Sequence, residues 1–254
     1  MLIGNNAFHN GLRISNYINI NTANLFRAME KLSSGFRINR ASDDPAGLVI
    51  SEQLRAQIGS MNQEIENISA NISKYNTADS LVGTMREHLT ELRSLAVAAS
   101  NTGFNSADAQ AAYNRSAELM AGGYNRIIDN SEYNRAKLFD GSPGSVAHVS
   151  KLSGINLSDS GAIKASLNLI AAAEKELNAA QVEIGSTVKN EFESERASLR
   201  VSVENLTAAE SNLRDTDFIS EFTNFMVESF KTKLGFVMLA HSKINAEMVL
   251  MLFK

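Results

Sequence analysis

The sequence predicts an all-α protein: a long antiparallel helical hairpin, forming a coiled-coil rod, with paired terminal helices and a small β-hairpin-like tip. Three observations predict this fold class. The 254 residues include only two prolines, so long stretches lack a strong helix breaker. Apolar residues recur at alternating intervals of four and three over most of the chain. Turn-forming residues, in contrast, concentrate between positions 139 and 160.

The first helix is expected from about residue 6 to residue 32. Its apolar positions fall on one helical stripe: Ile18, Leu25, Met29 and Leu32. The helix should end at Ser33-Ser34-Gly35, because serine competes for backbone hydrogen bonds and glycine favours a C-terminal cap. A polar segment then leads from Phe36 to Asp44.

The second helix is expected from residue 44 to about residue 101. Asp44 can cap the free N–H groups, and Pro45 fits the first helical position, where its missing donor would have no partner. The predicted coiled-coil core positions step by four and three: Leu54, Ile58, Met61, Ile65, Ile68 and Ile72. After Tyr75 and a three-residue step to Ala78, the alternation resumes at Val82, Met85, Leu89, Leu92 and Ala96. Such a helix would be roughly 85 Å long, so other helices must lie beside it.

A third helix is expected from residue 106 to about residue 128, followed by the turn-rich segment 139–160. The run Val146–Val149 is the only plausible β-structure in it, and a hairpin is expected there. The last helical region begins near residue 162, and its predicted core positions recur every seven residues: Phe192, Leu199, Leu206 and Leu213. Residues 214–217 interrupt it. A final amphipathic helix follows, with apolar positions Phe218, Phe222, Phe225, Phe230, Leu234, Val237 and Ile244.

Composition excludes several classes of function. The net charge is −4 and lysine and arginine do not cluster, so nucleic acid is not a favoured partner. Cysteine is absent, which excludes disulfides and thiolate metal sites. The longest apolar run, residues 248–253, is far too short for a membrane span. The start of the chain lacks the basic and apolar regions of a secretory signal, so no cleavable signal is expected.

No enzyme chemistry is expected either. The four histidines are scattered over different predicted elements, and no metal-binding spacing links them. The sequence contains no GxSxG, P-loop or dinucleotide-binding motif. We therefore predict no catalytic residue, no metal and no cofactor.

Two long motifs resemble a known family, the bacterial flagellins. Residues 29–48, MEKLSSGFRINRASDDPAGL, are similar to the N-terminal flagellin signature, and residues 205–217, NLTAAESNLRDTD, are similar to its C-terminal counterpart. Shorter matches at 92–97 and 132–134 lie where the family has similar motifs. The resemblance covers both arms of the hairpin, which is nearly the whole chain.

The resemblance implies a division that periodicity cannot give. Residues 1–43 and 215–254 would be the two arms of an inner-tube domain. Residues 44–138 and 161–214 would be the two parts of a rod domain. The segment 139–160 would be a short tip, leaving little or no outer domain. The chain would then be a minimal flagellin.

The resemblance also implies a function: a structural, non-enzymatic subunit that self-assembles into the extracellular flagellar filament for swimming motility. Its main partner would be further copies of itself. Flagellar export chaperone, filament cap and hook–filament junction proteins would be others, and export would run through the flagellum's own channel. The terminal helices would carry self-assembly, and we expect them to be disordered in the isolated subunit and to order on assembly.

Two further groups of residues follow from the resemblance. The junction between tube and rod contains Arg37, Asn39, Arg40, Asp43 and Asp44, which could form a solvated connector, an ion-paired hinge or an inter-subunit contact. Glu91 and Ser116 occupy the positions at which many flagellins carry an arginine and a glutamate for an innate immune receptor, and Leu95 is retained. Receptor recognition is therefore expected to be weakened.

Three alternatives remain open. A hook–filament junction protein shares the N-terminal motif but usually diverges at the C-terminal one. A cytoplasmic coiled-coil scaffold would form small soluble oligomers and would not be exported. An enzyme would need a pocket for which no residues are visible.

Overall fold

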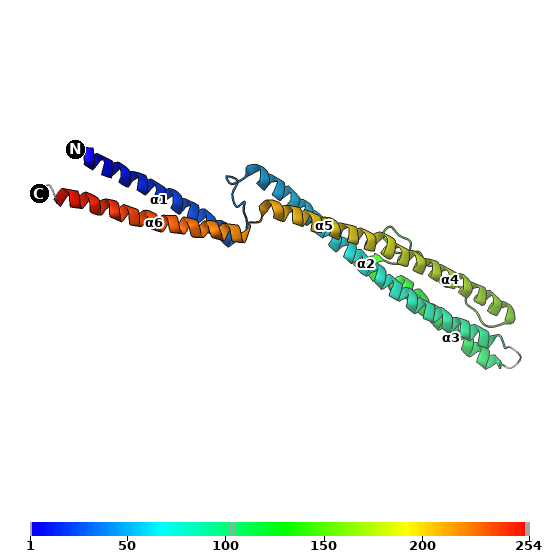
Figure 1. The fold of residues 1–254 in the computed structure, drawn as a ribbon. Coiled ribbons are helices and arrows are strands. Elements are labelled where there is room, and N and C mark those ends of the chain that lie inside the picture. Colours follow the sequence, from blue (N-terminus) through cyan, green and yellow to red (C-terminus); the bar gives the residue numbers. More distant parts are fainter. Residues whose placement is uncertain (1, 102, 104, 252–254) are drawn as a thin grey trace. The chain divides into compact units, whose positions relative to one another are not determined.

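The fold is helical along almost its whole length, as predicted. A computed structural model describes residues 2–101, 103 and 105–251, with side chains described from residue 9 to residue 241 within these ranges (Figure 1). The helices are α1 (Leu2–Ser34), α2 (Pro45–Ala99), α3 (Ala107–Asn130), α4 (Ser160–Ser186), α5 (Glu193–Arg214) and α6 (Phe218–Met251). A π-helical turn, η1 (Thr187–Phe192), separates α4 from α5, and two short strands, β1 (Glu132–Tyr133) and β2 (Ala136–Lys137), pair antiparallel.

The chain folds into two compact units. Unit 1 combines residues 1–60 with residues 203–254, and unit 2 comprises residues 61–202. The division therefore falls within α2 and α5. The finer division into inner-tube and rod domains remains a prediction from the resemblance.

In unit 1, α1 packs antiparallel on α6 (Figure 1). Ile18 and Ala28 of α1 and Thr232 of α6 are buried between the two helices. A Cβ atom built on Gly235 would lie 2.6 Å from Cγ1 of Ile18, so the two helices approach as closely as they do only because residue 235 has no side chain. The contact between the helices thus relies on small residues of α6.

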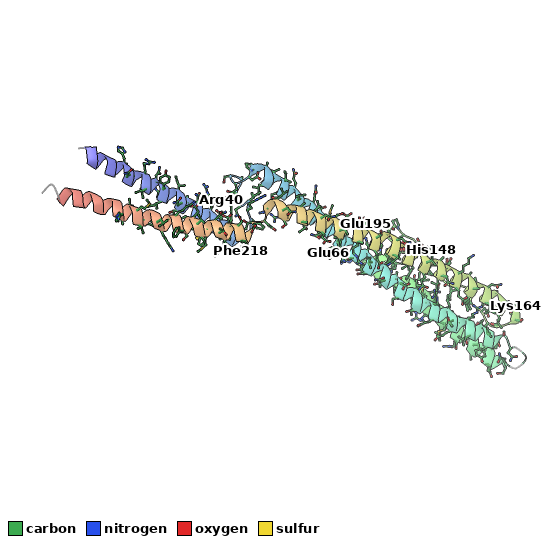
Figure 2. All side chains as sticks on the ribbon, viewed as in Figure 1. Arg40, Glu66, His148, Lys164, Glu195 and Phe218 are labelled. Carbon is green, nitrogen blue, oxygen red and sulfur yellow. The ribbon has the colours of Figure 1, made fainter. Side chains whose placement is uncertain are left out.

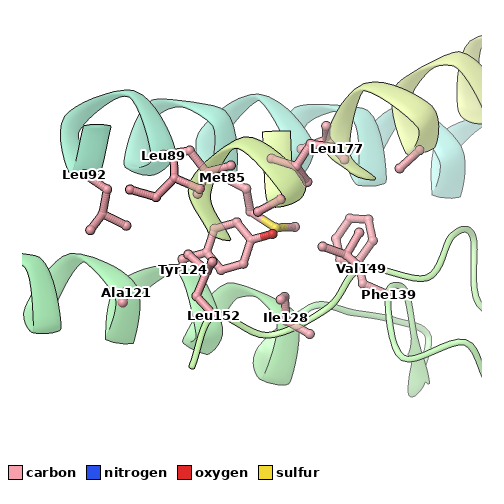
Figure 3. Close-up of a cluster of buried hydrophobic side chains, with 14 of the residues drawn as sticks. Met85, Leu89, Leu92, Ala121, Tyr124, Ile128, Phe139, Val149, Leu152 and Leu177 are labelled. Atoms are coloured by element: carbon pink, nitrogen blue, oxygen red, sulfur yellow. The ribbon is translucent and has the colours of Figure 1, made fainter. Parts of the chain in front are cut away.

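In unit 2, α2, α3, α4 and the loop 138–157 enclose one hydrophobic core (Figure 3). The predicted stripe of α2 faces it: Val82, Met85, Leu89, Leu92 and Ala96 are fully buried. Alanines of α3 and α4 occupy several other core positions: Ala117, Ala121, Ala173 and Ala180. Because these side chains are small, the helices can pack closely around the larger ones.

The β-hairpin lies at residues 132–137, before the segment in which it was expected. Asn134 and Arg135, at its turn, both have positive φ (51° and 68°), as a two-residue type I′ turn requires. The segment 139–160 forms only an isolated bridge between Asp140 and His148. Asn-Arg is a weaker turn signal than the glycines of the expected segment, because glycine adopts positive φ more readily than either residue.

The segment 139–160 comes close to the first half of α3 only with its last residues. The side-chain amide of Asn114, near the start of α3, accepts a hydrogen bond from the N–H of Leu157 at 2.8 Å. Apolar residues along the segment are buried in the core: Val146, Ala147, Val149, Leu152, Ile155 and Leu157. The segment therefore lies alongside the helices as a layer of the core.

The π-helical turn η1 corrects the phase of the C-terminal helices. Ile170, Leu177 and Ile184 are buried at intervals of seven residues, but Phe192 follows Ile184 by eight. A π turn accommodates this extra residue, because its hydrogen bonds join residues five apart. The ring of Phe192 then meets that of Tyr75 edge to face, with 5.1 Å between the ring centroids.

Candidate functional site

The terminal helices carry most of the predicted site residues, and the structure divides these residues into two groups. Ile18 is buried and Leu25, Leu32 and Phe225 are half-buried. The others are exposed: Met29, Phe218, Phe222, Leu234 and Val237. Ile244 lies in α6 but outside the residues whose side chains are described. Figure 2 shows Phe218 projecting at the start of α6.

The exposed apolar set is larger than the predicted one. Further large apolar side chains of the pair are exposed: Leu12, Tyr17, Ile20 and Phe26 on α1, and Ile219, Met226, Val227, Phe230, Phe236 and Met238 on α6. Together with the exposed predicted residues they form what we call the outward surface of α1 and α6. Soluble monomers seldom expose so many large apolar side chains on neighbouring helices, so this surface requires a partner.

The composition of α6 explains why the outward surface exists. Its side facing α1 presents the small or polar residues Thr232 and Gly235 beside the half-buried Phe225. The consecutive residues Phe236, Val237 and Met238 point in different directions around the helix, and all three are exposed. The apolar residues of α6 therefore lie on several of its sides, which one neighbouring helix cannot cover, and the run 236–238 signals this in the sequence.

The junction segment after α1 is tied to the chain that precedes α6. Gly35 has φ +76° and its N–H donates to the carbonyl of Lys31 at 2.9 Å, which caps α1. Thr216 donates its N–H to the Gly35 carbonyl at 2.9 Å. The Arg37 N–H donates to the Arg214 carbonyl at 2.6 Å, next to a bridge between Phe36 and Asp215. The two motifs of the sequence therefore meet here.

Arg214 lies at the centre of this meeting point. Its guanidinium stacks over the Phe36 ring, 4.6 Å from the ring centroid, and donates to Glu52 at 3.0 Å. The Arg214 side chain is only 14% exposed, and its Nε is buried without a hydrogen-bond partner among the residues that the structure describes. Arg37 in turn donates to the Leu213 carbonyl at 2.6 Å. Sequence reasoning missed Arg214, because its role depends on contacts between residues far apart in the chain.

The remaining junction residues form local caps and pairs. The carboxylate of Asp43 accepts the N–H groups of Arg40 (2.9 Å) and Asn39 (3.1 Å), and these bonds lower its pKa. Arg40, labelled in Figure 2, pairs with Glu30 of α1 at 2.9 Å. This pair is exposed and contributes little stability.

Asp44 and Gly47 start α2 together. The Asp44 carboxylate accepts the N–H of Gly47 at 2.9 Å, which is the expected N-cap. A Cβ atom on Gly47 would lie 2.8 Å from Cδ1 of Ile38, which is buried, and 2.3 Å from a carboxylate oxygen of Asp44. A larger residue at this position would therefore have to displace the Asp44 carboxylate or the Ile38 side chain.

The other predicted positions lie along α2, α3 and α5. Ile68 is buried, and the remaining coiled-coil positions are half-buried: Leu54, Ile58, Met61, Ile65, Ile72, Phe192, Leu199, Leu206 and Leu213. Glu91 is exposed, Leu95 packs partly against the core of unit 2, and Ser116 is half-buried. In the part of the chain that the structure describes, no group of three His, Asp or Glu side chains could hold a metal ion, and no helix is long and apolar enough to cross a membrane.

Comparisons with known proteins give matches to both regions that contain the two motifs. The family model described as the bacterial flagellin N-terminal helical region matches residues 6–143, and the one described as the C-terminal helical region matches residues 167–253. Flagellin of Halalkalibacterium halodurans is 34% identical, covering 93% of this chain and 94% of that protein. Flagellin of Bacillus subtilis is 28% identical and covers 96% of this chain and 97% of that protein.

Other similarities are more partial. The flagellar filament 41 kDa core protein of Borreliella burgdorferi is 36% identical over 53% of this chain and 39% of that protein. A crystal structure of Bacillus cereus flagellin matches 57% of this chain and 94% of that chain, with a TM-score of 0.46 and 18% identity.

Proposed function

This chain belongs to the bacterial flagellin family, and from that premise we propose that the outward surface of α1 and α6 is the surface through which it polymerises. Flagellins are structural subunits that self-assemble into the filament of the flagellum, and they are not enzymes. The short length of the chain fits a minimal form of the family. The observation that carries the proposal is the number of large apolar side chains that the two helices leave exposed.

The physical argument rests on how few helices are available in unit 1. A pair of helices can cover only the sides that face each other, so the other sides of α1 and α6 stay open. Covering them with a neighbouring copy would stabilise the contact by about 25 cal/mol per Å² of apolar area. A contact repeated from copy to copy without closing into a ring produces an open helical polymer.

A matched pair of variants tests the surface. Val237 of α6 is 65% exposed and Val182 of α4 is 72% exposed, so Val237→Ser and Val182→Ser remove the same methyl groups from similarly open positions. We expect Val237→Ser to raise the critical concentration for seeded polymerisation about five- to tenfold, because the lost burial is worth about 1 kcal/mol. Val182→Ser should polymerise like the unmodified protein.

Sedimentation of the seeded protein and electron microscopy of the pellets provide the readout, and circular dichroism checks that each variant is folded. The proposal fails if Val237→Ser keeps the original critical concentration. It also fails if Val182→Ser is impaired to the same degree, because the effect would then not be specific to the outward surface.

We propose that the junction segment acts as an ion-paired hinge of unit 1. Of the open interpretations, a solvated connector agrees least with the stacked Arg214 guanidinium and the backbone bonds that join Gly35 to Thr216 and Arg37 to Arg214. These contacts hold the end of α1, the start of α2 and the start of α6 together. The exposed Arg40 side chain remains available for a contact with a neighbouring copy.

The finer partners follow from the family and remain proposals. We propose export through the flagellum's own channel, and contacts with an export chaperone, the filament cap and the hook–filament junction proteins. We also propose that α1 and α6 become stably ordered only on assembly, because so much of their apolar surface needs a neighbour. Hydrogen exchange should then show residues 9–32 unprotected in the free subunit and protected in the filament.

Weakened recognition by the innate immune receptor also remains a proposal. Glu91 brings a negative charge to an exposed position where many family members carry an arginine, and Ser116 replaces a carboxylate. Full potency of the purified protein in a receptor reporter-cell assay would contradict it.

A further inference from the structure

Among the methionines whose side chains the structure describes, those of unit 1 are exposed and those of unit 2 are buried or half-buried. Cysteine is absent, so methionine is the only sulfur-containing residue. Met29, Met226 and Met238 of unit 1 are 44%, 53% and 61% exposed, respectively. In unit 2, Met85 is fully buried and Met61 and Met120 are half-buried. Every methionine that the structure describes as exposed therefore belongs to the outward surface of α1 and α6.

The thioether of an exposed methionine reacts with a peroxide. With hydrogen peroxide, the sulfur attacks one oxygen and the S–O bond forms as the O–O bond breaks. The proton of the attacked oxygen passes to the departing hydroxide, which leaves as water. The sulfur is oxidised by two electrons to the sulfoxide and the peroxide is reduced. The product replaces a flexible apolar side chain by a polar one whose oxygen accepts hydrogen bonds.

We propose that Met29, Met226 and Met238 are oxidation sites that stop a free subunit from polymerising and that become protected once neighbouring copies cover them. The inference rests on the proposed role of the outward surface. A sulfoxide oxygen carried into an apolar contact loses its water without gaining a donor, which opposes the contact. Each added subunit makes the same contact, so the effect acts at every step of growth.

Exposed apolar side chains lie near each of these three residues. Met226 lies next to the exposed Val227 and about one helical turn after the exposed Phe222. Met238 lies next to the exposed Val237. Met29 lies on α1 three residues from the exposed Phe26. A neighbouring copy would present the same kind of apolar side chains.

The first test uses hydrogen peroxide on the full-length protein, once as free subunit and once as preformed filament, with peptide mass spectrometry to locate the oxygen. In the free subunit we expect Met29, Met226 and Met238 to oxidise at least about tenfold faster than Met85, because oxidation follows exposure. In the filament their rates should fall about tenfold. Equal rates in both states would overturn the inference.

The second test measures polymerisation of the oxidised subunit. We expect its critical concentration to rise about tenfold or more, since one unsatisfied polar group at a contact has an effect of that order. The triple variant Met29→Leu, Met226→Leu, Met238→Leu should have the same critical concentration before and after peroxide, whatever its value before treatment. The matched variant Met61→Leu, Met120→Leu should stay sensitive.

Two outcomes separate this inference from the proposed function. If oxidised protein polymerises like untreated protein, or if the triple variant loses polymerisation after peroxide, these methionines are not the sensitive sites. The outward surface is then judged by Val237→Ser alone. If Val237→Ser polymerises normally while the oxidised protein does not, the proposed surface is wrong and the sensitivity has another cause.

Discussion

The α1–α6 pair of unit 1 and the core of unit 2 use the same kind of helix to opposite effect. In unit 2, large side chains such as Met85, Leu89 and Leu177 point inward and are fully buried. In the pair, the buried positions of α6 include Thr232, while Phe230 and Val237 point outward. The difference teaches that the apolarity of a helix does not decide its burial. The number of packing partners decides it: three helices and a loop surround the core of unit 2, but α6 has one.

The most direct way to break this comparison is one substitution made in both regions. Leu89 in α2 is fully buried and Leu234 in α6 is 44% exposed. We expect Leu89→Ala to destabilise unit 2 by about 2–5 kcal/mol, because it removes buried methyl groups and leaves a cavity. Leu234→Ala should change the stability of the free subunit by less than about 0.5 kcal/mol.

Urea unfolding followed by circular dichroism measures both free energies, and sedimentation after seeding measures polymerisation. Leu234→Ala should raise the critical concentration while leaving the unfolding curve in place. If the two variants lost equal stability, the outward position of Leu234 in the free subunit would be wrong.

A second prediction concerns the π turn, by which unit 2 keeps its apolar residues facing inward. Inserting one alanine after the exposed Asn190 adds a residue that the turn does not absorb, and it should rotate Phe192 and Leu199 by about 100° relative to α2. We expect a loss of about 2–3 kcal/mol, since two large side chains lose part of their burial. The control deletes Asn190, which should convert η1 to ordinary α-helix, place Phe192 seven residues after Ile184 and cost less than about 1 kcal/mol. If the deletion lost as much stability in urea unfolding as the insertion, the role of the turn in setting the phase would be refuted.

Sequence periodicity predicted the helices of both regions but could not predict which sides are covered. The stripe from Val82 to Ala96 was read correctly, because an amphipathic helix with one apolar side has one way to face a core. The eight-residue interval between Ile184 and Phe192 was visible, but it becomes meaningful only once the helix on each side is known to face the same core. For α6, the periodicity predicts one stripe, although apolar residues lie on several sides of the helix.

The junction shows the same limit from another direction. The N-cap role of Asp44 was predicted because it depends on neighbours in the sequence. The stacking of Arg214 on Phe36 was missed because it depends on residues brought together from two ends of the chain. Local signals predict caps, and pairings across the fold need the fold itself.

A third and smaller effect is expected at this junction, which allows the two-helix region to be perturbed without touching its apolar surface. Arg214→Ala should destabilise unit 1 by about 1–2 kcal/mol, because it removes the stacking on Phe36 and the bond to Glu52. In the assembled filament, where α1 and α6 are ordered, amide exchange at Arg37 and Thr216 should then accelerate about five- to thirtyfold. Arg200→Ala, at an exposed position of α5, is the control and should leave both amides unchanged.

The smallest expected effect concerns the core of unit 2, which contains a buried polar group without a hydrogen-bond partner among the described residues. The hydroxyl of Tyr124 is buried without a hydrogen-bond partner among the described residues, and burial raises the pKa of this phenol above its usual range (Figure 3). Tyr124→Phe should therefore be neutral or stabilise unit 2 by up to about 1 kcal/mol at neutral pH.

The sign of the pH effect follows from the same burial. Because the pKa of Tyr124 is higher in the folded than in the unfolded chain, the unfolded chain loses this proton first as the pH rises above about 10, and stability falls there. Tyr124→Phe removes that contribution, so its advantage over the unmodified protein should grow in alkaline solution, as urea unfolding at a series of pH values would show. A variant that is clearly less stable at neutral pH would mean that the hydroxyl has a buried partner, such as a water molecule. The core of unit 2 would then differ from the α1–α6 pair in two respects. Its buried polar groups would have hydrogen-bond partners, and its large apolar side chains would be covered.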